Sequence, residues 1–261
     1  MEKGPSGTER EILSSGGVAI DGAPVAYVIV LAAVVAVLAF VPFSIILGAG
    51  SSFPMSQSII ALMGWILGPV AGAVAAGIGR LAGVFLAPYT AGSMPAASVW
   101  GAVISAFAAG CMEAKGRRAW WWIPLGLIFM FELALFLGRA VLLNGVTLRV
   151  AVLNSFVDWS ALLLFVLPTR IWLARWISSD NTGRVAAGLF LGTWMIAGLS
   201  HLSVTMILYQ VLNWPNEVWV ALIPIIPVEH LFRCLVGAVI GTGVIAGMRA
   251  IGVVKPKWAI Y

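Results

Sequence analysis

Charged side chains are scarce in this sequence. Of its 261 residues only 10% are Asp, Glu, Lys or Arg, while 61% are hydrophobic. A soluble domain carries about 25% charged residues to solvate its surface, so the shortage excludes an ordinary water-soluble fold. Several apolar stretches approach or exceed the ~20 residues needed to cross a hydrocarbon core about 30 Å thick. Because these stretches are continuous, they predict helices rather than the alternating strands of a barrel.

The sequence also lacks the motifs of several enzyme classes. It has no Gly-rich loop ending in Lys-Ser or Lys-Thr, which an ATPase needs to hold phosphates. His-Glu-x-x-His, Cys-x-x-Cys and clustered aspartates are missing too, and two histidines are too few to indicate a metal site. We therefore expect no catalytic residues, no metal and no cofactor. If transport uses ATP, another subunit hydrolyses it.

Only two cysteines are present, Cys111 and Cys234, and both lie in apolar segments. The topology predicted below places them near opposite faces of the bilayer. We therefore expect two buried thiols that behave as small hydrophobic groups and form no disulfide.

Glycine, proline and charged clusters divide the apolar sequence into about eight predicted spans, within a range of six to eight. Gly68 and Pro69 interrupt a run that is too long for a single crossing. Three prolines within residues 213–227 predict an interfacial loop or a short helix there. The predicted spans cover residues 24–47, 57–67, 69–88, 96–112, 123–143, 150–172, 185–209 and 228–252.

The distribution of basic residues predicts the orientation. Eight spans place both termini on one side, and Lys and Arg concentrate there, with a cluster at residues 115–118, whereas the opposite loops hold only Arg139 and Arg149. By the positive-inside rule the termini are cytoplasmic, so the net charge of +5 indicates topology rather than a nucleic-acid partner. We predict an all-α, multi-pass helical bundle of the cell membrane. Its parts are a polar cytoplasmic segment (1–23), the transmembrane bundle (24–252) and a short basic cytoplasmic tail (253–261).

Ionisable side chains at membrane depth are costly and mark candidate functional positions. In the predicted topology most of them lie in the outer half, which predicts a polar pocket that opens outward, with aromatic side chains beside it. The last span would begin after Pro227, so its N-terminus would add unpaired donors and positive potential. The predicted binding residues are Arg80, Asp158, Trp159, Trp194, His201, Glu229, His230 and Arg233.

A structural role is the alternative for each of these groups. Glu229 and Arg233 are four residues apart, so they can pair on one helix face, which would weaken the case for a ligand. His230 lies about 100° further round and cannot join them without another helix. His201 can be a hydrogen-bonded interior residue. Interhelical ion pairs are the alternative for three groups: Glu132, Arg139 and Asp158.

Small residues four apart allow helices to approach closely. Ala32 and Ala36 have this spacing in the first span, and a Gly-rich series follows it from Gly68 to Gly83. Either packing within the bundle or contact with a partner explains both patterns.

Residues 61–79 resemble the short second span, Gly-Pro turn and Gly-rich third span of the S components of energy-coupling factor transporters. Residues 227–241 are similar to the last helix of that family, and Ala32 with Ala36 resembles its Ala-x-x-x-Ala motif. The resemblance implies a subunit that binds a vitamin or related small nutrient from outside. It also implies a transmembrane coupling subunit, contacted by the two alanines, and ATPase subunits that drive release inward. Typical members have six spans, so the extra hairpin around residues 132–170 is a departure.

The leading hypothesis is a membrane-embedded substrate-binding subunit without enzymatic activity. A polytopic enzyme acting on a lipid or isoprenoid, with Asp158, His201 or Glu229 as acid or base, is the first alternative. A noncatalytic scaffold of a membrane complex is the second.

Overall fold

The computed structural model describes residues 18–42, 53–113 and 116–261. Within these ranges the chain is mainly helical, as predicted for an all-α protein, and the only sheet is a hairpin of β1 (Ala19–Ile20) and β2 (Ala23–Pro24). The α-helices are α1 (Val25–Leu38), α2 (Ile60–Leu67), α3 (Pro69–Leu86), α4 (Pro95–Gly110), α5 (Trp122–Gly138), α6 (Leu148–Asn154), α7 (Phe156–Val166), α8 (Thr169–Ile177), α9 (Thr182–Leu212), α10 (Asn216–Leu222) and α11 (Ile225–Ala250).

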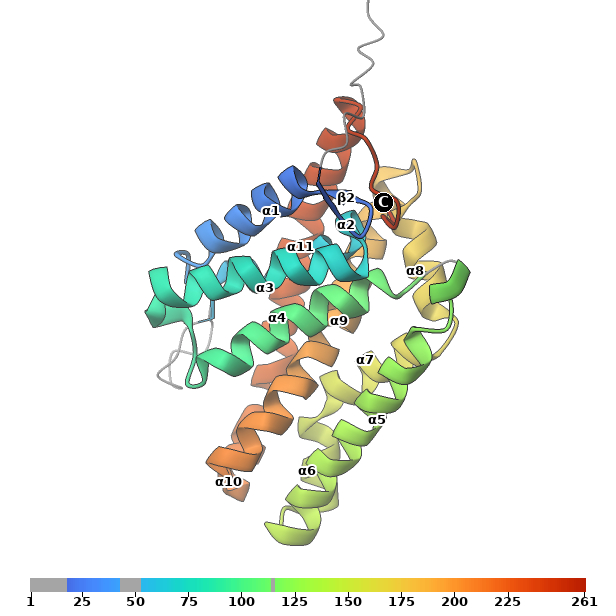
Figure 1. Cartoon of the computed structure of the whole chain (residues 1–261). Coiled ribbons are helices and arrows are strands. Elements are labelled where there is room, and N and C mark those ends of the chain that lie inside the picture. The colour runs from blue at the N-terminus through green and yellow to red at the C-terminus, as the bar shows by residue number, and fades with distance from the viewer. Residues whose placement is uncertain (1–17, 43–52, 114–115) are drawn as a thin grey trace, which may run out of the picture.

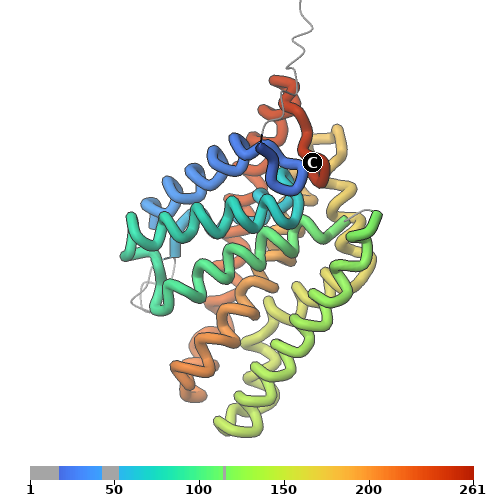
Figure 2. Tube along the Cα trace, in the orientation of Figure 1, coloured from blue at the N-terminus to red at the C-terminus, as the bar shows by residue number. Residues whose placement is uncertain are grey.

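The helices form two groups. One comes from the first part of the chain and contains α1, α3 and α4, and the other comes from the last part and contains α9 and α11. In Figure 1, α1, α3 and α4 lie side by side and run across the long helices α9 and α11. The tube in Figure 2 shows α5, α6 and α7 beside them, and α5 and α7 pack on α9. Helix α9 connects the groups, because it contacts α4, α5, α7, α8 and α11.

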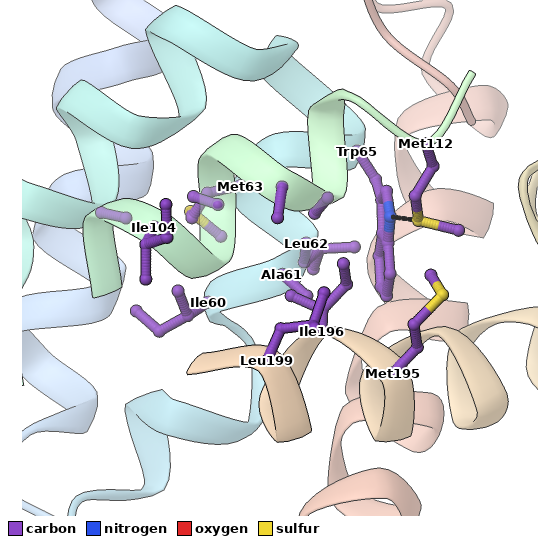
Figure 3. Packing of buried hydrophobic residues seen from close by; sticks show 14 of the residues in the cluster. Ile60, Ala61, Leu62, Met63, Trp65, Ile104, Met112, Met195, Ile196 and Leu199 are labelled. Atoms are coloured by element: carbon purple, nitrogen blue, oxygen red, sulfur yellow. Dashed lines mark hydrogen bonds between the residues drawn. The ribbon is translucent and has the colours of Figure 1, made fainter. Parts of the chain in front are cut away.

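Helix α2 lies at the centre of the bundle. All eight of its residues are buried, and Figure 3 shows its side chains between those of α4 and α9. Its indole donor Trp65 Nε1 lies 3.0 Å from Met112 Sδ. A Cβ atom on Gly64 would lie 2.0 Å from the Ala106 carbonyl oxygen, so glycine is required for the close approach of α2 and α4.

The break between α2 and α3 falls where the sequence predicts it. Gly68 has φ +85°, a left-handed conformation that glycine adopts without strain, and Pro69 is the first residue of α3. Trp258 packs against Gly68, and Ile260 N donates to the Trp65 carbonyl at 2.8 Å. The C-terminal tail is therefore docked on the bundle, beside the β1–β2 hairpin.

Four segments are long and apolar enough to cross a membrane: α3, residues 116–143, α9 and α11. A fifth results if α6 and α7, which meet at a bend of 64°, form one span. The structure thus supports a membrane-embedded helical protein, while the count of eight spans and the orientation stay predictions. Helix α2 is about 12 Å long at 1.5 Å per residue, so it does not cross a bilayer by itself.

Three other predicted elements differ or lie elsewhere. The span over 150–172 is not one helix, because the chain breaks at Ser155 and again at Leu167 and Pro168. The short helix expected within 213–227 is α10. The predicted end of the first span, Lys115 and most of the segment 1–23 lie outside the described residues.

Candidate ligand-binding site

A cavity of about 660 Å³ lies between the two helix groups, at the end of the bundle away from the tail. Helix α11 shows this placement, because it begins beside the cavity and ends at Ala250 near the tail. Residues of α3, α4, α9, α10 and α11 line the cavity, together with the loop between α3 and α4. Four of the predicted binding residues are among the lining: Arg80, His201, Glu229 and Arg233.

Arg80 is positioned by α3 and by the loop that follows it. Its Nε donates to Ser98 Oγ at 3.2 Å, and its Nη2 donates to the Thr90 carbonyl at 2.8 Å. Nη1 is buried and has no hydrogen-bond partner within the described residues. The whole side chain is only 1% exposed, so the guanidinium is held rigidly with one nitrogen unpaired.

Glu229 and Arg233 form an ion pair along one face of α11. Arg233 Nη2 donates to Glu229 Oε1 at 2.8 Å, and both side chains are nearly buried. The Arg233 guanidinium also lies 5.1 Å from the centre of the Phe53 ring. The pairing that the four-residue spacing allows is therefore formed, and it neutralises this side of the cavity.

Helix α11 begins earlier than the sequence predicts. The helix begins at Ile225, so Pro227 lies in its first turn, where a missing N–H removes no helical hydrogen bond. Glu229 falls in the second turn and Arg233 in the third. Ile226 of the first turn lines the cavity together with these side chains, so a contribution from the first-turn backbone donors stays a prediction.

A second polar pair lies on α7 and α9. His201 Nδ1 is 2.7 Å from Asp158 Oδ1, and Asp158 is 1% exposed. The His230 ring lies edge-on to His201 with centroids 5.1 Å apart, and its Nδ1 is 3.0 Å from the Ile226 carbonyl oxygen. His201 reaches the cavity, whereas Asp158 and His230 stand behind it and hold its position.

The two predicted aromatic residues are not part of the cavity lining. Trp159 Nε1 donates to the Val152 carbonyl at 3.1 Å, and Trp194 Nε1 donates to Ser160 Oγ at 3.1 Å. The Trp194 ring packs against His230 with centroids 6.2 Å apart. Trp194 therefore belongs to the layer behind His201.

Within the described residues neither Glu132 nor Arg139 forms the interhelical ion pair considered for it. Ser203 Oγ donates to Glu132 Oε1 at 2.9 Å. Arg139 donates to Gln210 Oε1 at 3.0 Å and to Asn213 Oδ1 at 3.4 Å. Asp158, the third group considered, pairs with His201.

The structure also assigns cavity residues that the sequence did not single out. They are uncharged polar or aromatic side chains, and a lone serine or asparagine in a helix gives no sequence signal. The three prolines after α9 indicate only a departure from a regular span, and this departure brings Trp214 and α10 to the cavity. The unpredicted polar and aromatic members of the lining include Gln57, Ser98, Ser105, Ser200, Thr205 and Trp214.

Of the two alanines predicted to contact a partner, Ala32 is 5% exposed and Ala36 is half-buried. A Cβ atom on Gly79 would lie 2.5 Å from the Ala32 carbonyl oxygen, so this part of α1 packs closely on α3. Ala32 therefore packs within the chain, whereas Ala36 is the more accessible of the two positions and its contact with a partner stays a prediction.

No protein-family model, curated protein or solved structure matches the chain.

Proposed function

We propose that this chain is a membrane-embedded binding subunit that captures a small, water-soluble nutrient for uptake. The observation that carries the proposal is that one cavity gathers Arg80, His201, Glu229 and Arg233 from three helices. A volume of about 660 Å³ suits a vitamin-sized molecule, because ligand pockets span about 300–1,000 Å³. With cytoplasmic termini, the end that holds the cavity faces outward.

The energy source would be external to this chain. The resemblance to S components implies a transmembrane coupling subunit and ATPase subunits, and the chain itself has no phosphate-binding loop. Bilayer lipid surrounds the bundle, and no nucleic acid takes part.

The proposal is tested by purifying the chain in mild detergent and identifying any retained small molecule by mass spectrometry. We expect one molecule per chain. Ala102→Phe, at a position that lines the cavity, should prevent retention, whereas the matched Ala33→Phe at an exposed position should not. The identified compound should accumulate in cells that express the chain with its partners. A monodisperse protein that retains nothing and binds nothing would refute the proposal.

One observation favours a second candidate, an enzyme acting on a membrane-soluble substrate. His201 faces the cavity and is oriented by buried Asp158, an arrangement that suits a general base. Incubation with the retained molecule separates the candidates. An enzyme would release a product, and His201→Gln would stop turnover without weakening binding. A binding subunit would return the molecule unchanged.

A further inference from the structure

Two arginines line the cavity, and within the described residues only one of them is paired with a carboxylate. Arg233 has a carboxylate at 2.8 Å, so its charge is compensated within the chain. The hydrogen bonds of Arg80 go to a hydroxyl and a carbonyl, which are both neutral. None of the three ion pairs in the described part of the chain includes Arg80.

An uncompensated charge at this depth is unstable without a counter-ion. Burial of a cation in a medium of low polarity costs several kcal/mol unless an anion pairs with it. Arg80 is 1% exposed, and its Nη1 is buried without a partner among the described residues. Two neutral acceptors hold the other nitrogens and prevent the side chain from turning away. The site is therefore arranged to receive an acceptor at Nη1.

We propose that the captured molecule carries a single carboxylate, which binds Arg80 Nη1, and an uncharged body that fills the rest of the cavity. This proposal rests on the proposed function and adds the chemical class of the ligand. One uncompensated positive charge is balanced by a monoanion, whereas a phosphate monoester would leave excess negative charge beside Glu229. The remaining lining is largely apolar, with Ile60, Val204 and Leu208, and suits an uncharged ring or chain.

The experiment has two parts. In the first, mass spectrometry of the purified chain shows whether the retained molecule has a carboxylate. In the second, calorimetry compares matched probes: phenylacetate with phenylacetamide, indole-3-acetate with indole-3-acetamide, and inorganic phosphate. We expect each acid to bind at least about tenfold more tightly than its amide, since a hydrogen bond to a charged group contributes about that factor or more. We expect no binding of phosphate.

Variants then assign the preference to Arg80. Arg80→Gln should weaken binding of the acids by about tenfold or more and leave the amides within about threefold. Arg139→Gln, the matched change outside the cavity, should alter neither. If Arg80→Gln fails to fold, Arg80→Lys keeps the positive charge and should keep the preference for acids, but it should weaken their binding because lysine offers a point charge in place of the guanidinium fork.

Each result has a defined meaning. If amides bind as well as acids, or if the preference for acids survives in Arg80→Gln, the proposed contact between a ligand carboxylate and Arg80 is refuted. The proposed function as a binding subunit is not affected by either result. A retained molecule without an acid group would also refute this contact and leave that function unaffected. A retained phospholipid would assign Arg80 to a lipid headgroup and overturn the proposal. If the wild type binds no probe and retains nothing, the proposed function fails as well.

Discussion

The ion pair on α11 gives the sharpest test of the site's energetics. Glu229 and Arg233 share one hydrogen bond of 2.8 Å and are 4% and 7% exposed. Removing one partner of a buried pair destabilises a protein by about 3–5 kcal/mol, because the other charge stays buried alone. Both side chains border a cavity that admits water, so we expect the low end, about 3 kcal/mol, for Arg233→Met.

The two single variants should differ. In Glu229→Gln the amide oxygen still accepts a hydrogen bond from Arg233, and the guanidinium keeps its contact with Phe53. We therefore expect a loss of only about 1–2 kcal/mol. The double variant leaves no unpaired charge and should recover most of the loss, so the coupling energy should be about 2–4 kcal/mol.

Thermal unfolding in detergent, followed with a thiol-reactive fluorophore, measures these differences. Cys111 and Cys234 are both free and buried, so they react when the bundle opens. The assay is repeated without added ligand and at two salt concentrations, because a buried pair is screened little by salt. Losses that simply add in the double variant would show that the two side chains do not interact and would refute this account of the pair.

Three further predictions test packing, orientation and partner contact. Gly64→Leu should lower the free energy of unfolding by more than about 3 kcal/mol or prevent folding, because its Cβ would clash with the backbone of α4. Gly243→Leu is the control: it has open space around its Cβ and should fold normally in the same thermal assay. In intact cells a cysteine at Asn144 should react with an impermeant thiol reagent and one at Lys257 should not; the reverse pattern would invert the orientation. Ala36→Leu should leave the isolated chain folded and able to bind its ligand but abolish co-purification with a coupling subunit, and loss of folding would instead assign Ala36 to internal packing.

Local chemistry explains which parts of the fold the sequence predicts. The division at Gly68 and Pro69 is confirmed, because glycine adopts positive φ without strain and proline favours the first position of a helix. Proline was misleading at Pro227, since the first turn of a helix tolerates it. The break at Ser155 has no glycine or proline, and the hydrophobic pattern continues through it, so the sequence gives no signal for it.

In the site, too, the sequence predicts contacts that depend on local spacing but not contacts between residues far apart in the chain. The pairing of Glu229 with Arg233 follows from their spacing on one helix. His201 and Asp158 are 43 positions apart, and their contact depends on how α7 packs on α9. The positive charge of Arg80 is uncompensated because no carboxylate lies near it among the described residues. No local pattern contains that information.

The burial of α2 has a consequence for biogenesis. An eight-residue apolar helix is too short to partition into the bilayer as an independent unit, and its full enclosure requires residues of α9. During synthesis more than a hundred residues separate Leu67 from Thr182, where α9 starts. Until α9 is made, mainly α3 and α4 cover the apolar side chains of α2. The face of α2 that α9 later covers is therefore a surface of the nascent chain that an insertase or chaperone can bind.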